Sequence, residues 1–129
     1  MLRSLENKVA WVTGAGTGIG EAGAIALAHA GMHVVLSGRR REKLAEVARL
    51  CGDAVSIEML DVADRDAVAE VAQRIIATHG RIDVLVASAG INVKERNWHN
   101  VSLDDWDSVI RIDLDGAFYC CKAVTAINI

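Results

Sequence analysis

Residues 8–31 have the sequence KVAWVTGAGTGIGEAGAIALAHAG, and this stretch decides the fold. Its first six residues are mostly β-branched or aromatic, so they predict a short buried strand. Residues 19–30 are rich in alanine and favour a helix, which Gly31 would end. Between the two lies the segment TGAGTGIG at residues 13–20, which we call the glycine loop. The stretch therefore predicts a strand, a glycine-rich turn and a helix in direct succession.

The same alternation continues along the rest of the chain. Further strands are predicted from short apolar runs at residues 33–37, 54–60 and 82–88. Helices are predicted from apolar residues at helical spacing over residues 44–51, 68–76 and about 103–125. A polar loop at residues 92–102 precedes the last helix. This strict alternation predicts one α/β domain over residues 1–129, in which helices cover both faces of a parallel sheet.

Composition narrows the classes of protein that fit. The chain has 129 residues, of which 52% are hydrophobic and 24% charged, so it is neither disordered nor fibrous. The net charge of −3 gives no basis for binding nucleic acid or an anionic membrane. The first residues carry no secretory signal, and no apolar stretch predicts a membrane span. We therefore expect a cytoplasmic protein with neither nucleic acid nor a membrane as a partner.

The cysteines and histidines predict neither a disulfide nor a metal site. Cys51, Cys120 and Cys121 are odd in number and lack CxxC spacing, so we expect reduced, buried thiols. His29 and His33 have the i, i+4 spacing of metal ligands on a helix, but a glycine interrupts the helix between them. We expect no bound metal.

The glycine loop has the position and the chemistry of a phosphate-binding turn. Ligands of open α/β sheets bind beyond the carboxyl ends of the strands, where this loop lies. Glycines let the backbone approach a phosphate, and free N–H groups at the start of the helix can donate to it. A P-loop is excluded because no Gly-Lys-Ser/Thr follows, and the G-x-G-x-x-G spacing from Gly14 fails at Ile19. Thr13, Gly14, Gly18 and Gly20 match Thr-Gly-x-x-x-Gly-x-Gly instead.

With this motif the sequence resembles the short-chain dehydrogenase/reductase family over residues 5 to about 124. The resemblance implies a Rossmann-type doubly wound parallel sheet, here truncated after the fourth strand and its following helix. It also implies a nicotinamide dinucleotide as cofactor. The positions that match the family's cofactor site are Gly14, Gly16, Thr17, Gly18, Ile19, Gly20, Arg39, Asp61, Val62, Ser88, Ala89 and Gly90.

Two of these regions depend on side chains that leave alternatives open. By the resemblance Asp61, after the third strand, would contact the adenine ring, but a helix-capping acid would occupy the same place. Residues 87–90 (ASAG) resemble the family's Asn-Asn-Ala-Gly segment after the fourth strand, with both asparagines replaced. Ser88 can supply only part of the hydrogen bonding of the lost amide. Ala89 and Gly90 would keep the close packing against the cofactor.

The end of the second predicted strand indicates which dinucleotide binds. Enzymes that use NAD place an acid there to bind the ribose 2′-hydroxyl group, but residues 37–41 read SGRRR. Arginine is a bidentate, permanently charged partner for a 2′-phosphate. By the resemblance Gly38 has the position of the acid, and Arg39 would select NADP over NAD. The alternative is a solvated basic turn, which suits Arg40 and Arg41 better.

Most of the catalytic residues that the resemblance implies are missing from the chain. The family transfers a hydride between the nicotinamide and a carbonyl or alcohol, using a Ser…Tyr-x-x-x-Lys set that this sequence lacks. Tyr119 and Lys122 are three residues apart rather than four, so we interpret that pair as a coincidence. Residues 112–116 (IDLDG) resemble the family's Val-Asn-Leu-x-Gly segment, which gives Asp113 the place of the asparagine of the catalytic tetrad.

The helical pattern also marks Asp113. It shares one predicted stripe with apolar residues of the last helix, namely Trp106, Ile110, Ala117 and Val124. A carboxylate buried on that stripe has to be hydrogen-bonded. A satisfied structural acid is the alternative to a role in the proton relay.

The sequence therefore predicts the cofactor-binding half of an NADP-dependent short-chain dehydrogenase/reductase. The substrate of the full-length protein would be a small carbonyl compound or alcohol, and the 129-residue chain alone would be inactive. The uncovered edge of the fourth strand and the apolar last helix predict a homo-oligomer. The alternative is a non-catalytic module that binds a dinucleotide or a protein partner.

Overall fold

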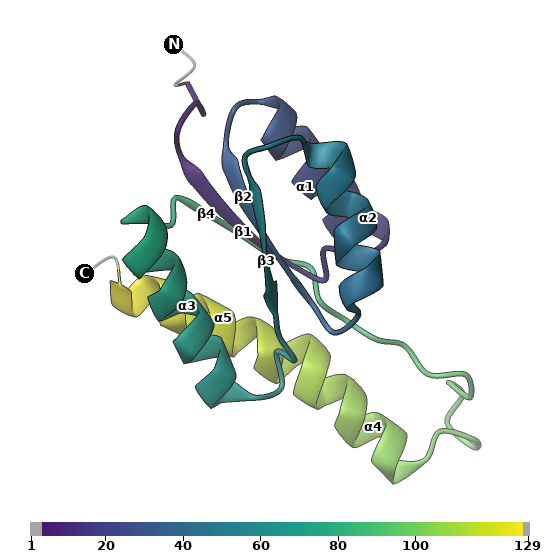
Figure 1. The fold of residues 1–129 in the computed structure, drawn as a ribbon. Helices are drawn as coiled ribbons and strands as arrows, with labels where there is room; N and C mark the ends of the chain where they lie inside the picture. The colour runs from purple at the N-terminus through teal and green to yellow at the C-terminus, as the bar shows by residue number, and fades with distance from the viewer. Residues whose placement is uncertain (1–3, 128–129) are drawn as a thin grey trace.

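The computed structural model describes residues 4–127 and has a parallel sheet at its centre. The strands are β1 (Val9–Thr13), β2 (His33–Gly38), β3 (Val55–Met59) and β4 (Val84–Ala87). They lie in the order β3-β2-β1-β4, and every neighbouring pair is parallel (Figure 1). The predicted α/β fold with a parallel sheet is confirmed, and each predicted strand is present with ends shifted by a residue or two.

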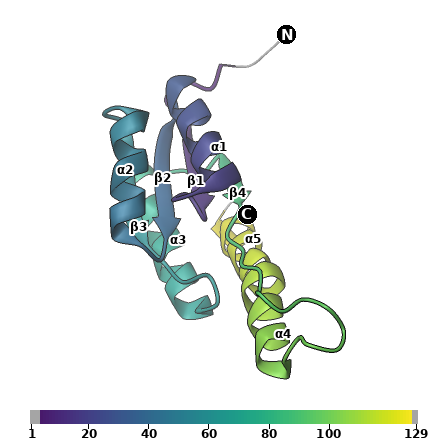
Figure 2. The same cartoon turned by 90° about the vertical axis from the view of Figure 1, so that its right-hand side faces the viewer.

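Helices cover both faces of this sheet. The helical segments are α1 (Gly18–His29), α2 (Arg41–Cys51), α3 (Arg65–His79), α4 (Leu103–Val109), η1 (Ile110–Gly116) and α5 (Ala117–Ile127). α1 and α2 lie on one face, whereas α3 and α5 lie on the other (Figures 1 and 2). None of the helices within residues 4–127 is long and apolar enough to cross a membrane.

The side chains of strand β1 contribute to two hydrophobic cores, one on each face of the sheet. Successive side chains of a strand point to opposite faces of the sheet. Ala10 and Val12 pack into the core under α1 and α2, and Val9 and Trp11 pack into the core under α3 and α5. All five residues of β1 are buried, as expected for a central strand of a parallel sheet.

The last predicted helix is present, but it is not one uniform α-helix. The chain is α-helical in α4, π-helical over the seven residues of η1, and α-helical again in α5. A π-turn contains more residues than an α-turn, so the side chains of η1 do not follow a stripe drawn at 3.6 residues per turn. The prediction that Asp113 is buried is wrong: Asp113 is exposed, and its neighbour Ile112 is buried. The predicted stripe is exposed before η1 as well, because Trp106 of α4 is 52% exposed.

Strand β4 is an outer strand of the described sheet and pairs with β1 alone. Its residues are partly or fully exposed, in contrast to those of β1. The expectation of an uncovered edge at the fourth strand is confirmed for the described residues. The rod formed by α4, η1 and α5 passes below the sheet, and α4 extends well beyond it (Figure 1).

The three thiols have two different environments. Cys51 and Cys120 are buried, but Cys121 is exposed, so the prediction of three buried thiols is wrong for Cys121. Neighbouring positions of a helix point in directions about 100° apart, and only Cys120 faces the core. Burial raises the pKa of Cys51 and is the main cause that raises the pKa of Cys120 to about 12.

We expect one fast-reacting thiol in the native chain. The thiolate is the nucleophile, so at pH 8 a disulfide reagent such as DTNB should modify Cys121 first. Cys51 and Cys120 should react only when the chain opens or unfolds. Stopped-flow DTNB labelling tests this, with Cys121→Ser as the control that removes the fast phase. A fast phase that survives in Cys121→Ser contradicts the described environments.

A pair of histidines lies at the other end of the sheet from the glycine loop. His33 begins β2, and its ring centroid is 4.0 Å from that of His79 at the end of α3. The Nε2 atom of His33 is 3.3 Å from the hydroxyl oxygen of Ser56. Burial, and secondly the neighbouring His79, lower the pKa of His33 below its ordinary value of 6.5.

We therefore expect the free energy of unfolding to fall in mild acid. A lowered native pKa means that the unfolded chain binds the proton more tightly than the folded chain. The stability that neutral His33 contributes is present above pH 6.5 and is lost as the pH falls below it, through the native pKa. Urea unfolding at pH 7.5, 6.0 and 5.0 measures this loss, and His33→Gln should reduce it. An equal loss in His33→Gln would assign the acid sensitivity to other groups.

Candidate functional site

The glycine loop is held closed by hydrogen bonds to both neighbouring strands. The hydroxyl of Thr13, at the end of β1, accepts from the backbone N–H of Ala89 at 3.2 Å and donates to the carbonyl of Val86 at 3.5 Å. On the other side, the backbone N–H of Ala15 donates to the carbonyl of Ser37 at 3.1 Å. The loop therefore lies across the carboxyl ends of β4, β1 and β2, where ligands of such sheets bind.

Three glycines of the loop differ in what a side chain at their position would contact. Gly14 has φ of +60°, and a Cβ atom there would lie 2.7 Å from the backbone of Ala89. A Cβ atom on Gly20 would overlap the carbonyl oxygen of Gly14. Gly18 has φ of +59°, but a Cβ atom there would meet nothing within 4 Å. Gly14 and Gly20 thus permit the loop to close, whereas Gly18 borders open space.

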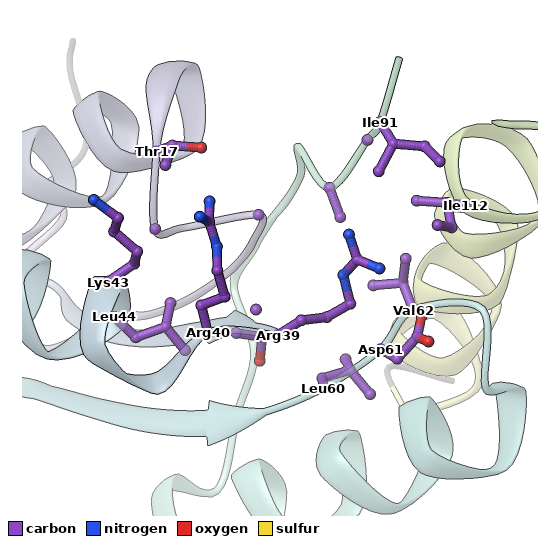
Figure 3. Close-up of a pocket in the computed structure, with 16 residues that line it drawn as sticks. Thr17, Arg39, Arg40, Lys43, Leu44, Leu60, Asp61, Val62, Ile91 and Ile112 are labelled. Atoms are coloured by element: carbon purple, nitrogen blue, oxygen red, sulfur yellow. The ribbon is translucent and has the colours of Figure 1, made fainter. Parts of the chain in front are cut away.

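A cavity opens beside this loop (Figure 3). The residues that line it are Gly14, Gly16, Thr17, Ser37, Gly38, Arg39, Arg40, Lys43, Leu44, Leu60, Asp61, Val62, Ala89, Gly90, Ile91 and Ile112. They come from the ends of the strands and from the segments that follow each of them. Eight of the twelve predicted cofactor residues are among them, so the structure brings together segments far apart in the sequence.

Four predicted cofactor residues do not line the cavity: Gly18, Ile19, Gly20 and Ser88. Gly18 and Gly20 belong to the start of α1, and Ile19 is 83% exposed. Ser88 is partly buried, and its backbone N–H donates to the carbonyl of Val86 at 3.1 Å. Their predicted contacts with a cofactor stay predictions.

Sequence reasoning missed several residues that line the cavity. Arg40 is exposed at the N-cap of α2, as expected for a solvated basic turn that opens the helix, but it also lines the cavity together with Arg39. Lys43, in the first turn of α2, also lines the cavity and was not predicted from the sequence. The apolar lining residues Leu44, Leu60, Ile91 and Ile112 carry no polar signal that a motif would reveal.

Asp61 lies at the edge of this cavity and does not cap α3. Its Oδ1 atom accepts from the backbone N–H of Ala63 at 3.0 Å, which forms a local turn. The cap of α3 is Asp64, whose Oδ1 accepts from the backbone N–H of Ala67 at 3.1 Å. The capping alternative for Asp61 is therefore wrong, and Asp61 lines the cavity beside Val62 (Figure 3).

Asp113 joins the π-helical segment to the chain that follows β4. Its Oδ1 atom accepts from the backbone N–H of Ile91 at 2.7 Å. A Cβ atom added to Gly90 would lie 3.2 Å from the same oxygen, so glycine suits this close approach. Asp113 does not line the cavity, but its neighbour Ile112 and its partner Ile91 do. The carboxylate can therefore position the cavity wall, and its predicted place in a proton relay stays a prediction.

The remaining candidates lie elsewhere. Tyr119 and Lys122 border a separate groove between α3 and α5, away from the glycine loop. Within residues 4–127, no three His, Cys, Asp or Glu side chains are placed to hold a metal ion together.

Comparison with known proteins agrees with this geometry. The family model described as short chain dehydrogenase matches residues 8–127. An uncharacterized oxidoreductase of Staphylococcus aureus strain USA300 is 40% identical over 120 residues, which cover 92% of this chain and 52% of the relative. The chain thus spans about half the length of the curated relatives it matches.

Solved structures give the same result. A metagenomic short-chain oxidoreductase in complex with NADP is 36% identical with a TM-score of 0.90, covering 97% of this chain and 58% of that one. A xylitol dehydrogenase with bound NAD+ is 30% identical with a TM-score of 0.91, covering 96% of this chain and 49% of that one. From the loop motif, the sheet order and these matches, the chain belongs to the short-chain dehydrogenase family.

Proposed function

We propose that this chain is the cofactor-binding half of an NADP-dependent oxidoreductase. The observation that carries the proposal is the basic lining of the cavity beside the glycine loop. Arg39, Arg40 and Lys43 line it at the end of β2, and Gly38 stands where an NAD-binding acid would stand. A cavity with cations and no such acid favours a dinucleotide with a phosphate on its ribose.

The residues present fit such a cofactor. Gly14 and Gly16 line the cavity, and the open space at Gly18 leaves room for a pyrophosphate close to the start of α1. No carboxylate of the described residues lies within ion-pair distance of Arg39 or Arg40. Leu60, Asp61 and Val62 would face the adenine, whereas Ala89, Gly90 and Ile91 would continue along the cofactor beside β4.

When bound, the nicotinamide would supply or accept a hydride in exchange with a small carbonyl or alcohol substrate. This chain's residues would bind and orient the dinucleotide. Asp113 would fix the cavity wall through its hydrogen bond to Ile91. Because the sequence lacks the Ser and Tyr-x-x-x-Lys set, we propose that the 129-residue chain alone does not turn over substrate.

A titration with both cofactors tests the proposal. NADPH should bind more tightly than NADH, measured by isothermal calorimetry or nicotinamide fluorescence at one ionic strength. Equal affinities would remove the NADP preference, and no binding of either would leave the protein-interaction module as the better account.

We also propose that the chain is a homo-oligomer. The rod of α4, η1 and α5 exposes large apolar side chains: Leu103 (83% exposed), Trp106 (52%), Leu114 (61%) and Phe118 (62%). An apolar surface of this kind is typical of a protein–protein interface. Light scattering at micromolar concentration should give a mass above 13.8 kDa. A Phe118→Glu variant should be closer to the monomer mass, and a monomeric wild-type chain would contradict the proposal.

A further inference from the structure

We infer that the groove between α3 and α5 binds a small carboxylate with an apolar tail, such as a medium-chain fatty acid. The groove has a volume of about 290 Å³ and shares no lining residue with the cavity beside the glycine loop. This volume is close to the lower end of the roughly 300–1,000 Å³ that is typical of small-molecule sites. Seven residues line the groove, far fewer than the roughly 20–30 that each partner contributes to a stable protein interface. Its size therefore suits a small ligand better than a protein.

The floor and walls of the groove are largely apolar. Ala69 of α3 and Ala123 of α5 both line it, and their small side chains leave a hollow between the two helices. Phe118 and Tyr119 add aromatic rings, whose centroids are 6.2 Å apart in an edge-to-face arrangement. Phe118 is 62% exposed, so an alkyl chain in the groove would remove apolar ring surface from water. These residues would hold the tail of the ligand.

Two cations lie on the two helices that form the groove. Arg65 is the first residue of α3, and Lys122 is the one charged residue of α5. Within residues 4–127, neither forms an ion pair with a carboxylate. The dipole of a helix disfavours a cation at its N-terminus, so the stability of α3 does not account for Arg65. Both charges are available for the head group of a ligand.

The balance of charge in the groove favours a monoanion. Asp66 also lines it, in the first turn of α3, where a carboxylate suits the helix dipole. With Arg65 and Lys122, the three charged groups leave one net positive charge. A carboxylate head group would balance this charge, whereas a phosphate dianion would leave an excess of negative charge. A guanidinium group can also bind a carboxylate through two parallel hydrogen bonds.

Isothermal calorimetry with octanoate, at a concentration that forms no micelles, tests the inference. Arg65→Gln and Lys122→Gln should each weaken octanoate binding about tenfold, as for the loss of one charge-assisted hydrogen bond. Ala69→Leu should fill the groove and remove measurable binding, and because Ala69 is exposed the fold should tolerate leucine. Ala69→Met gives a second filling variant if the leucine variant is unstable. The matched control is Arg49→Gln, which removes one cation from the last turn of α2 and should bind octanoate as the wild-type chain does.

Two further probes separate the head group from the tail. Acetate has the same head group without the tail, and octyltrimethylammonium has the same tail with a cationic head group. Neither should bind in the groove measurably. Saturation with NADP+ should leave the Kd for octanoate unchanged, because the groove and the cavity have no lining residue in common.

Several results would overturn the inference, and none of them bears on the proposed function. A wild-type chain that does not bind octanoate would do so directly. Octanoate affinity that Arg65→Gln, Lys122→Gln and Ala69→Leu all retain would place the ligand elsewhere, for example on the exposed apolar side chains of the rod. Displacement by NADP+ would place it in the cavity beside the glycine loop. Equal binding of octyltrimethylammonium would mean that the two cations do not recognise the head group.

Discussion

Arg39→Asp is expected to reverse the cofactor preference, so that NADH binds more tightly than NADPH. The substitution removes one of the three cations of the cavity and adds a carboxylate at the end of β2. Aspartate is shorter than arginine, so its carboxylate stays at the strand end, where it repels a 2′-phosphate and accepts from a ribose hydroxyl. We expect the ratio of the two Kd values to change about a hundredfold.

The control for this variant is Arg49→Asp, which makes the same change of charge in the last turn of α2. Arg49 does not line the cavity. Parallel titrations of both variants with NADPH and NADH distinguish a local effect from the change in net charge. If Arg39→Asp leaves the order of the two affinities unchanged, the predicted role of Arg39 in selecting NADP is wrong.

The second large effect is expected at Gly14. Gly14 and Gly18 have nearly the same left-handed conformation, with φ of +60° and +59°, but only Gly14 is in tight contact with its surroundings. An alanine costs about 1–2 kcal/mol at either position because of the backbone conformation. At Gly14 its Cβ would also lie 2.7 Å from the backbone of Ala89 and Ser88, which adds about 1–3 kcal/mol of overpacking.

Chemical denaturation of Gly14→Ala and Gly18→Ala measures both costs in free energy of unfolding, that of the backbone conformation and that of overpacking. Gly14→Ala should lose several kcal/mol of the roughly 5–15 kcal/mol that stabilises a typical domain. Gly18→Ala should lose about 1–2 kcal/mol, remain folded and bind the dinucleotide more weakly, because its methyl group enters the open space beside the loop. Equal losses of stability would mean that the contact of Gly14 with Ser88 and Ala89, after the end of β4, does not constrain the fold.

The sequence predicted the elements of this fold well because their signals are local. The apolar run of β1, the stop at Gly31 and the alternation of strands and helices each depend on a few neighbouring residues. The π-helical turn in η1 was not predictable in this way. It coincides with two tertiary contacts, the hydrogen bond that the backbone N–H of Ile91 donates to Asp113 and the close approach of Gly116 to Val62. A helical period cannot reveal contacts with segments far away in the chain.

The residues of the candidate site were likewise predictable where the sequence signal is local and not where it depends on tertiary packing. Motif spacing predicted the glycine loop because the closed turn requires glycine at Gly14 and Gly20. Arg39 was predicted from its place after the second strand, and it lines the cavity. Lys43 and Ile112 entered only with the structure, since their place in the cavity depends on how α2 and η1 pack. Cys121 and Asp113 were misplaced for a related reason: the exposed side of a helix is set by its partners as much as by its own pattern.

The central claim is that a nicotinamide dinucleotide binds at the carboxyl ends of the strands. Hydrogen–deuterium exchange of the chain with and without saturating NADP+ tests this most directly. We predict slower exchange at residues 14–20, 37–43, 60–62 and 88–91, which form and border the cavity. The groove at residues 65–69 and 118–123 should be unaffected. Protection confined to that groove, or none in either region at saturation, would contradict the account.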